Sequence, residues 1–119
     1  MESTGQPGVA AEAALAQAID KLWVRFLPEI RERVTVLEAA ASAVAATKLS
    51  AAGREAAKAA AHKLAGVLGT FSLTRGTDLA RELEVTYSHK AAPSPADGER
   101  LAGLAAELRN LVEHRAPSA

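Results

Sequence analysis

The chain has 119 residues, which is the size of one domain and too few for two independent cores. Its 14 basic and 14 acidic residues cancel, so it lacks the basic excess with which nucleic-acid-binding proteins neutralise phosphates. The absence of cysteine excludes disulfides and thiolate metal sites, and no apolar run is long enough to span a bilayer.

The first part of the chain predicts a tail followed by one or two helices. Residues 1–8 are polar, with two glycines and a proline, and predict a disordered tail. They lack the basic-then-apolar pattern of a signal peptide, so a cytoplasmic location is expected. A first helix is predicted over about residues 9–26, with its apolar residues on one face: Leu15, Ile19, Leu22 and Phe26. Pro28 either kinks one long helix or opens a second, and the apolar stripe resumes over residues 30–44.

Three further helices are predicted from their start and stop signals. Ser50 is a good N-cap for the third helix. The fourth ends in His89 and Lys90, cations that suit the negative end of a helix dipole. Ser94 begins the fifth helix, which stops before Pro117.

The fold class predicted from these elements is all-α. No stretch alternates with period two, and the short connections favour antiparallel neighbours. We therefore expect an antiparallel up-down-up-down four-helix bundle with an additional N-terminal helix packed on it. The expected domain covers residues 9–115, residues 116–119 form a C-terminal tail, and the protein is expected to be a monomer.

His62 lies almost opposite the predicted core face of the third helix when residues are placed at 100° steps around the axis. The core sector holds Ala57, Ala60, Leu64 and Phe71. The neighbours of His62 on the outer face are Glu55, Lys58, Ala59, Ala65, Gly66 and Gly69. An exposed helix face usually carries long charged side chains and strong helix formers, so this run of small residues is unusual.

The two glycines on this face predict a docking surface. Each mid-helix glycine costs about 1 kcal/mol relative to alanine, so a pair of them calls for a reason. Helical side chains lean toward the N-terminus, so the residue four positions after His62 should lie over the imidazole. That residue is Gly66, which leaves the ring uncovered. The predicted docking face consists of Ala59, Ala65, Gly66 and Gly69.

The run A-A-H-K-L-A-G-V-L-G-T-F from Ala60 to Phe71, followed by L-A-R-E-L-E from Leu79 to Glu84, resembles the histidine-containing phosphotransfer domain family. The family pattern is a histidine, a leucine two later, a glycine four later, and a downstream helix ending in leucine-glutamate. The matching residues are His62, Leu64, Gly66, Leu83 and Glu84. With the helix count, the resemblance covers about residues 15–115.

The resemblance implies a phosphocarrier without catalytic activity of its own. The imidazole of His62 is expected to take a phosphoryl group from the aspartate of one response-regulator receiver domain and pass it to another. A sensor histidine kinase is a further expected donor. Phosphoryl transfer needs positioning and charge stabilisation above all. The receiver would bring the Mg²⁺ ion, so no metal or other cofactor is expected on this chain.

One departure from the family pattern concerns charge. The family usually has a lysine three residues after the histidine, and here that position is Ala65. Lys58, one turn before His62 on the same face, is the first candidate to balance the phosphoryl charge. Lys63, 100° around the helix, is the second.

Two function classes follow. The first is the phosphocarrier. The alternative is a helical docking bundle that binds receiver domains without transferring phosphate, which the Ala65 departure keeps open.

His89 and His114 are explained by their places in the last turns of helices. The three histidines lack paired-ligand spacing, so no metal site is predicted.

Overall fold

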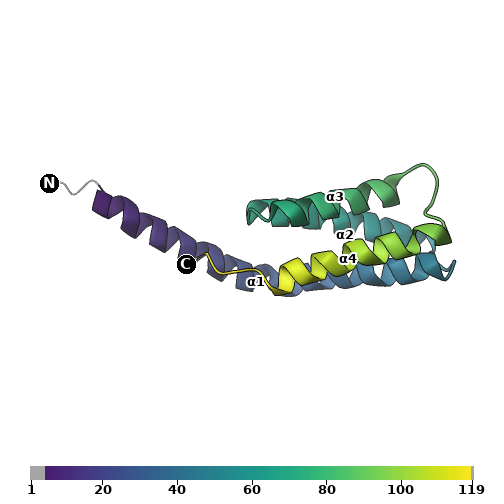
Figure 1. The fold of residues 1–119 in the computed structure, drawn as a ribbon, viewed down its shortest axis with the longest axis horizontal. Helices are drawn as coiled ribbons and strands as arrows, with labels where there is room; N and C mark the ends of the chain where they lie inside the picture. Colours follow the sequence, from purple (N-terminus) through teal and green to yellow (C-terminus); the bar gives the residue numbers. More distant parts are fainter. Residues whose placement is uncertain (1–4, 119) are drawn as a thin grey trace.

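The computed structural model describes residues 5–118, with side chains from Gly8 onward. Its elements are α1 (Gly5–Ala45), α2 (Ala51–Thr70), α3 (Thr74–Ser88), the 3₁₀ turn η1 (Pro95–Asp97) and α4 (Gly98–Glu113). The predicted all-α bundle is confirmed: α2 and α4 each pack against α1 and α3, with successive helices antiparallel (Figure 1). Within this described range, no helix is both long and apolar enough to cross a membrane.

Helix α1 is a single helix of 41 residues that contains Pro28. Of the two possibilities predicted at Pro28, one long helix or the start of a second helix, the structure shows one long helix. A proline removes its own N–H and frees the carbonyl four residues earlier, here that of Val24. Both Pro28 and Val24 are exposed, so water can satisfy that carbonyl, and the helix continues.

The N-terminal part of α1 projects beyond the other three helices, so the predicted packing of residues 9–26 on the bundle is only partly correct (Figure 1). Val9 and Leu15 are 65% and 62% exposed, whereas Trp23 is buried. The apolar stripe continues past the end of the bundle, where α2 and α4 no longer cover it. The molecule is accordingly elongated, measuring 67 × 23 × 21 Å.

The two predicted tails differ from the structure in part. Helix α1 begins at Gly5, so residues 5–8 are helical, while residues 1–4 lie outside the described part of the chain. At the other end, the Ser118 backbone N–H donates to the Asp20 carboxylate at 2.8 Å. Arg115 donates to the same carboxylate at 3.1 Å and lies over the Trp23 ring. Residues 115–118 are therefore held against α1.

The predicted start signals act as expected. Ser50 caps α2, its hydroxyl oxygen accepting the Gly53 N–H at 2.9 Å. Ser94 and Asp97 form a capping box around η1, which leads directly into α4. These caps set the ends of α2 and α4.

Leucines and alanines make up most of the core. Fully buried leucines come from all four helices: Leu37, Leu64, Leu68, Leu79, Leu83, Leu101 and Leu108. Alanines let the helices approach closely, and Ala57, Ala61, Ala80 and Ala105 are fully buried. A close backbone approach occurs at Gly98, where an added Cβ would lie 2.8 Å from the Ala45 Cβ and 2.9 Å from its Cα.

Gly98→Ala is therefore expected to lower the free energy of unfolding by about 1 to 3 kcal/mol, because the new methyl group overpacks the α1–α4 contact. Gly103→Ala is the matched control, since an added Cβ there has no neighbour within 4 Å. It should raise stability by up to about 1 kcal/mol through helix propensity. Chemical denaturation of both variants measures the difference. Equal stabilities would contradict the close approach at Gly98.

Candidate functional site

His62 lies in the middle of α2 and points away from the core, with its side chain 74% exposed. Its Nδ1 atom lies 2.8 Å from Oε2 of Glu84, on the neighbouring helix α3. The Glu84 side chain is 27% exposed, so the carboxylate is held at the edge of the α2–α3 contact. The two helices together therefore fix the orientation of the imidazole.

This hydrogen bond determines which ring nitrogen is available. An ionised carboxylate only accepts, so Nδ1 must carry the proton that it donates to Glu84. In the neutral ring the lone pair is then on Nε2, the nitrogen on the far side of the ring. The site presents a nucleophilic nitrogen on an exposed ring held in one tautomer.

A shallow hollow surrounds His62 between α2 and α3, lined by Glu55, Lys58, Ala59, His62 and Glu84. The structure thus places Lys58 beside His62, as the sequence predicts. The Lys58 Nζ lies 3.9 Å from Oε2 of Glu55, one turn earlier on α2. A pair that long and that exposed contributes little, which leaves the ammonium able to turn toward an anion at His62. Lys63 is exposed next to His62 and does not line the hollow.

The predicted docking face is bare at three of its four positions. Ala59, Gly66 and Gly69 are exposed. An added Cβ at Gly66 would have no neighbour within 4 Å, and one at Gly69 would only touch the Thr77 hydroxyl at 3.7 Å. The backbone beside the imidazole is therefore open to close approach.

Ala65 is the exception, because it is buried at 7% exposure and cannot belong to an exposed docking face. The prediction assumed a narrow core sector on α2. In the structure α2 is covered by α1 on one side and α3 on the other, so its buried arc is wider. Ala61 and Ala65 lie on that arc together, and both are buried.

The role of Glu84 was not predicted from sequence, where this residue appears only as part of the family pattern. Glu84 lies beside His62 because of the register between α2 and α3. A helical wheel describes one helix at a time and cannot predict that register. The local sequence gives one indication that Glu84 lies near a helix contact, which is that it follows the buried Leu83 on α3.

Arg54 stabilises the end of α3 and is not a free cation near the site. Its guanidinium donates to the Tyr87 carbonyl at 2.9 Å and to the carbonyls of His89 and Ala91. These groups would otherwise be unpaired at the helix C-terminus. Across the described residues, no group of three or more histidine, aspartate or glutamate side chains is arranged to hold a metal ion.

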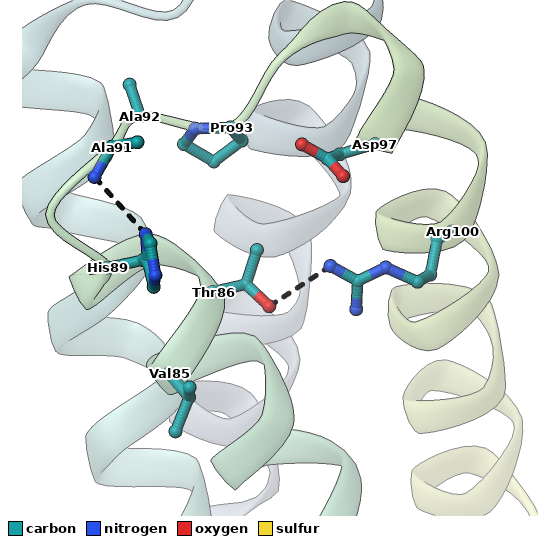
Figure 2. A pocket seen from close by; sticks show the side chains of 8 residues that line it. All are labelled: Val85, Thr86, His89, Ala91, Ala92, Pro93, Asp97 and Arg100. Atoms are coloured by element: carbon teal, nitrogen blue, oxygen red, sulfur yellow. Dashed lines mark hydrogen bonds between the residues drawn. The ribbon is translucent and has the colours of Figure 1, made fainter.

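A second hollow lies at the far end of α3, next to the connection with α4 (Figure 2). Its polar groups are already bonded within the chain: His89 Nδ1 accepts the Ala91 N–H at 3.2 Å, and Arg100 donates to the Thr86 hydroxyl at 3.3 Å. Asp97 accepts the Ser94 N–H at 2.8 Å. These bonds shape the connection, so the hollow is a weaker candidate than the His62 face.

His114 caps the end of α4, where its Nδ1 lies 2.9 Å from the Asn110 carbonyl oxygen. This contact matches the predicted role of a histidine at a helix C-terminus. His89 follows α3 and bonds to the connection beyond it, so neither ring resembles the free, oriented imidazole of His62.

Sequence comparisons with known proteins identify the family of this chain. The family model described as Hpt domain matches residues 21–114, which include both partners of the His62–Glu84 bond. A curated relative, Protein RcaC of Microchaete diplosiphon, is 26% identical over 96 residues, covering 81% of this chain. The chain spans only 15% of that relative's length. No solved structure matches significantly. The resemblance predicted from the sequence is thus confirmed, and the chain belongs to the Hpt domain family.

Proposed function

We propose that His62 carries a phosphoryl group between the aspartates of receiver domains in a two-component phosphorelay. The observation that carries the proposal is the 2.8 Å hydrogen bond from Nδ1 to Glu84, which leaves Nε2 free on an exposed ring. The bare backbone at Gly66 supports it, because a receiver must bring its aspartyl phosphate within bonding distance of that nitrogen.

In the forward step, the Nε2 lone pair attacks the phosphorus of the aspartyl phosphate. The N–P bond forms, the P–O bond to the aspartate breaks, and the carboxylate leaves with the electron pair. The ring keeps its Nδ1 proton and becomes positively charged, and Glu84 is placed to balance that charge. The reverse sequence passes the group to a second aspartate.

Under this proposal, the chain has no catalytic activity on its own. The receiver supplies the acidic pocket and its Mg²⁺ ion, while this chain supplies the nucleophile and cations. Lys58, which lines the hollow beside His62, is the first candidate cation on α2, and Lys63 is the second. A sensor histidine kinase could serve as the donor in place of the first receiver, with the same attacking nitrogen.

Incubation with a receiver domain carrying ³²P on its aspartate, with Mg²⁺ present, tests the proposal. The label should move to this chain and be acid-labile and base-stable, as phosphohistidine is. Stable binding of the receiver without transfer of label would instead support the docking bundle that the Ala65 departure suggests.

Glu84→Ala should slow uptake from the receiver by about tenfold, because a lost hydrogen bond to a charged group costs roughly 1.5 kcal/mol or more. The ring would then sample both tautomers, which nitrogen-15 spectra of the imidazole would record as a mixture. Glu55→Ala is the matched control, since Glu55 lines the same hollow without bonding to His62. If Glu84→Ala transfers at the normal rate with one tautomer, Glu84 does not orient the ring.

A further inference from the structure

The proposed phosphoryl group would meet a negatively charged surface. A phosphoryl group carries close to two negative charges at neutral pH. Two carboxylates, Glu55 and Glu84, line the hollow beside His62. Among the described residues a single cation, Lys58, lines the same hollow, and its ammonium lies 3.9 Å from the Glu55 carboxylate. The position where the family usually has a lysine is Ala65, so a further cation is needed from elsewhere.

The register between α2 and α3 shows which residue faces Ala65. Two observations define it: His62 bonds to Glu84, and a Cβ added at Gly69 would lie 3.7 Å from the Thr77 hydroxyl. From the first pair to the second, the residue number on α2 rises from 62 to 69 and the residue number on α3 falls from 84 to 77. Equal and opposite steps are expected for two antiparallel helices. Three residues on from His62 is Ala65, and three residues back from Glu84 is Arg81.

Both residues lie on the flanks of their helices that face each other. Residues three or four apart share a helix face. Arg81 is four residues after Thr77 and three before Glu84, the two α3 residues that mark the register with α2. Ala65 is likewise three residues after His62 and four before Gly69. Ala65 is only 7% exposed, as expected of a residue on a flank that faces a neighbouring helix.

Arg81 is exposed, and within residues 5–118 it forms no hydrogen bond or ion pair. The other arginine on α3, Arg75, is bound to Glu107 of α4 at 2.7 Å on the opposite flank. The guanidinium of Arg81 is therefore free to swing across the small Ala65. Arginine suits this role because its planar fork can donate two parallel hydrogen bonds to phosphoryl oxygens.

We propose that Arg81, reaching across from α3, provides the positive charge beside the phosphoryl group on His62 that the family's lysine provides from α2. This inference rests on the proposed function of His62. It also explains how an alanine is tolerated at position 65: a lysine there would add a second positive charge near Arg81, and like charges repel.

The test compares Arg81→Gln, Arg81→Lys and the unaltered protein, each phosphorylated with phosphoramidate. Phosphorus NMR during a pH titration gives the pKa of the phosphoryl group, which a nearby cation lowers. Arg81→Gln should raise that pKa by about 0.5 and slow transfer to a receiver by roughly three- to tenfold. Arg81→Lys should retain most of both properties. Arg25→Gln, an exposed arginine on α1, has the same charge change and should alter neither.

A second variant places the charge on the other helix. Ala65→Lys in the Arg81→Gln background should restore the lower pKa and much of the rate, because the lysine extends from α2 toward the same group. An Arg81→Gln protein with an unchanged phosphoryl pKa overturns the proposal, even if transfer slows, because Arg81 would then contact only the receiver. If the unaltered protein takes up no phosphoryl group, the proposed function fails, and this proposal with it.

Discussion

Replacing His62 with glutamine is expected to abolish phosphoryl uptake and leave the thermal midpoint nearly unchanged. Glutamine has no nitrogen lone pair that can attack phosphorus, so no N–P bond can form. The side chain is 74% exposed and outside the core, and such substitutions usually change the free energy of unfolding by less than about 0.5 kcal/mol. Label transfer from a phosphorylated receiver and a thermal melt measure the two quantities.

His114→Gln is the matched control, because it removes an imidazole that caps α4 far along the chain from the site. It should leave uptake unchanged and cost at most a little stability. If His62→Gln unfolds the domain, the histidine is structural and the site assignment is wrong. Uptake that persists in folded His62→Gln protein would place the phosphoacceptor elsewhere.

Gly66→Gln is expected to make the protein more stable and a much poorer phosphocarrier. An added Cβ at Gly66 has no neighbour within 4 Å, so the new side chain meets no steric clash. Replacing an exposed mid-helix glycine with a good helix former raises stability by up to about 1 kcal/mol. The glutamine leans back toward the N-terminus of α2, over His62, and obstructs an approaching receiver. The thermal midpoint and the transfer rate should therefore change in opposite directions.

Gly103→Gln separates the two effects. Gly103 is also an exposed helical glycine with open space around its Cβ position, but it lies on α4. Its substitution should bring a similar gain in stability with no change in transfer. If Gly66→Gln transfers at the normal rate, the open backbone beside His62 is not a docking surface. A loss of stability would mean that Gly66 is needed for packing.

The parts of the fold that depend on local chemistry were predictable from sequence. Ser50 caps α2 because its hydroxyl accepts a backbone N–H three residues later, and Ser94 begins the turn before α4 in a capping box with Asp97. The exposure of His62 and Gly66 also follows from the 3.6-residue period of one helix.

Features that depend on neighbouring helices were not predictable in the same way. Ala65 is buried because α1 and α3 both pack on α2, and a helical wheel of α2 contains no information about its neighbours. The hydrogen bond to Glu84 and the position of Arg81 depend on the same register. The continuity of α1 through Pro28 depends on whether the freed carbonyl of Val24 faces solvent.

The central claim is that Nε2 of His62 carries the phosphoryl group, and the most direct measurement locates that group. The protein is phosphorylated with phosphoramidate, and nitrogen and phosphorus NMR identify the modified atom before a receiver with Mg²⁺ is added. The account predicts a single phosphohistidine at His62, bonded through Nε2, that the receiver discharges. A phosphoryl group on Nδ1 or on another residue, or one that the receiver leaves in place, would contradict it.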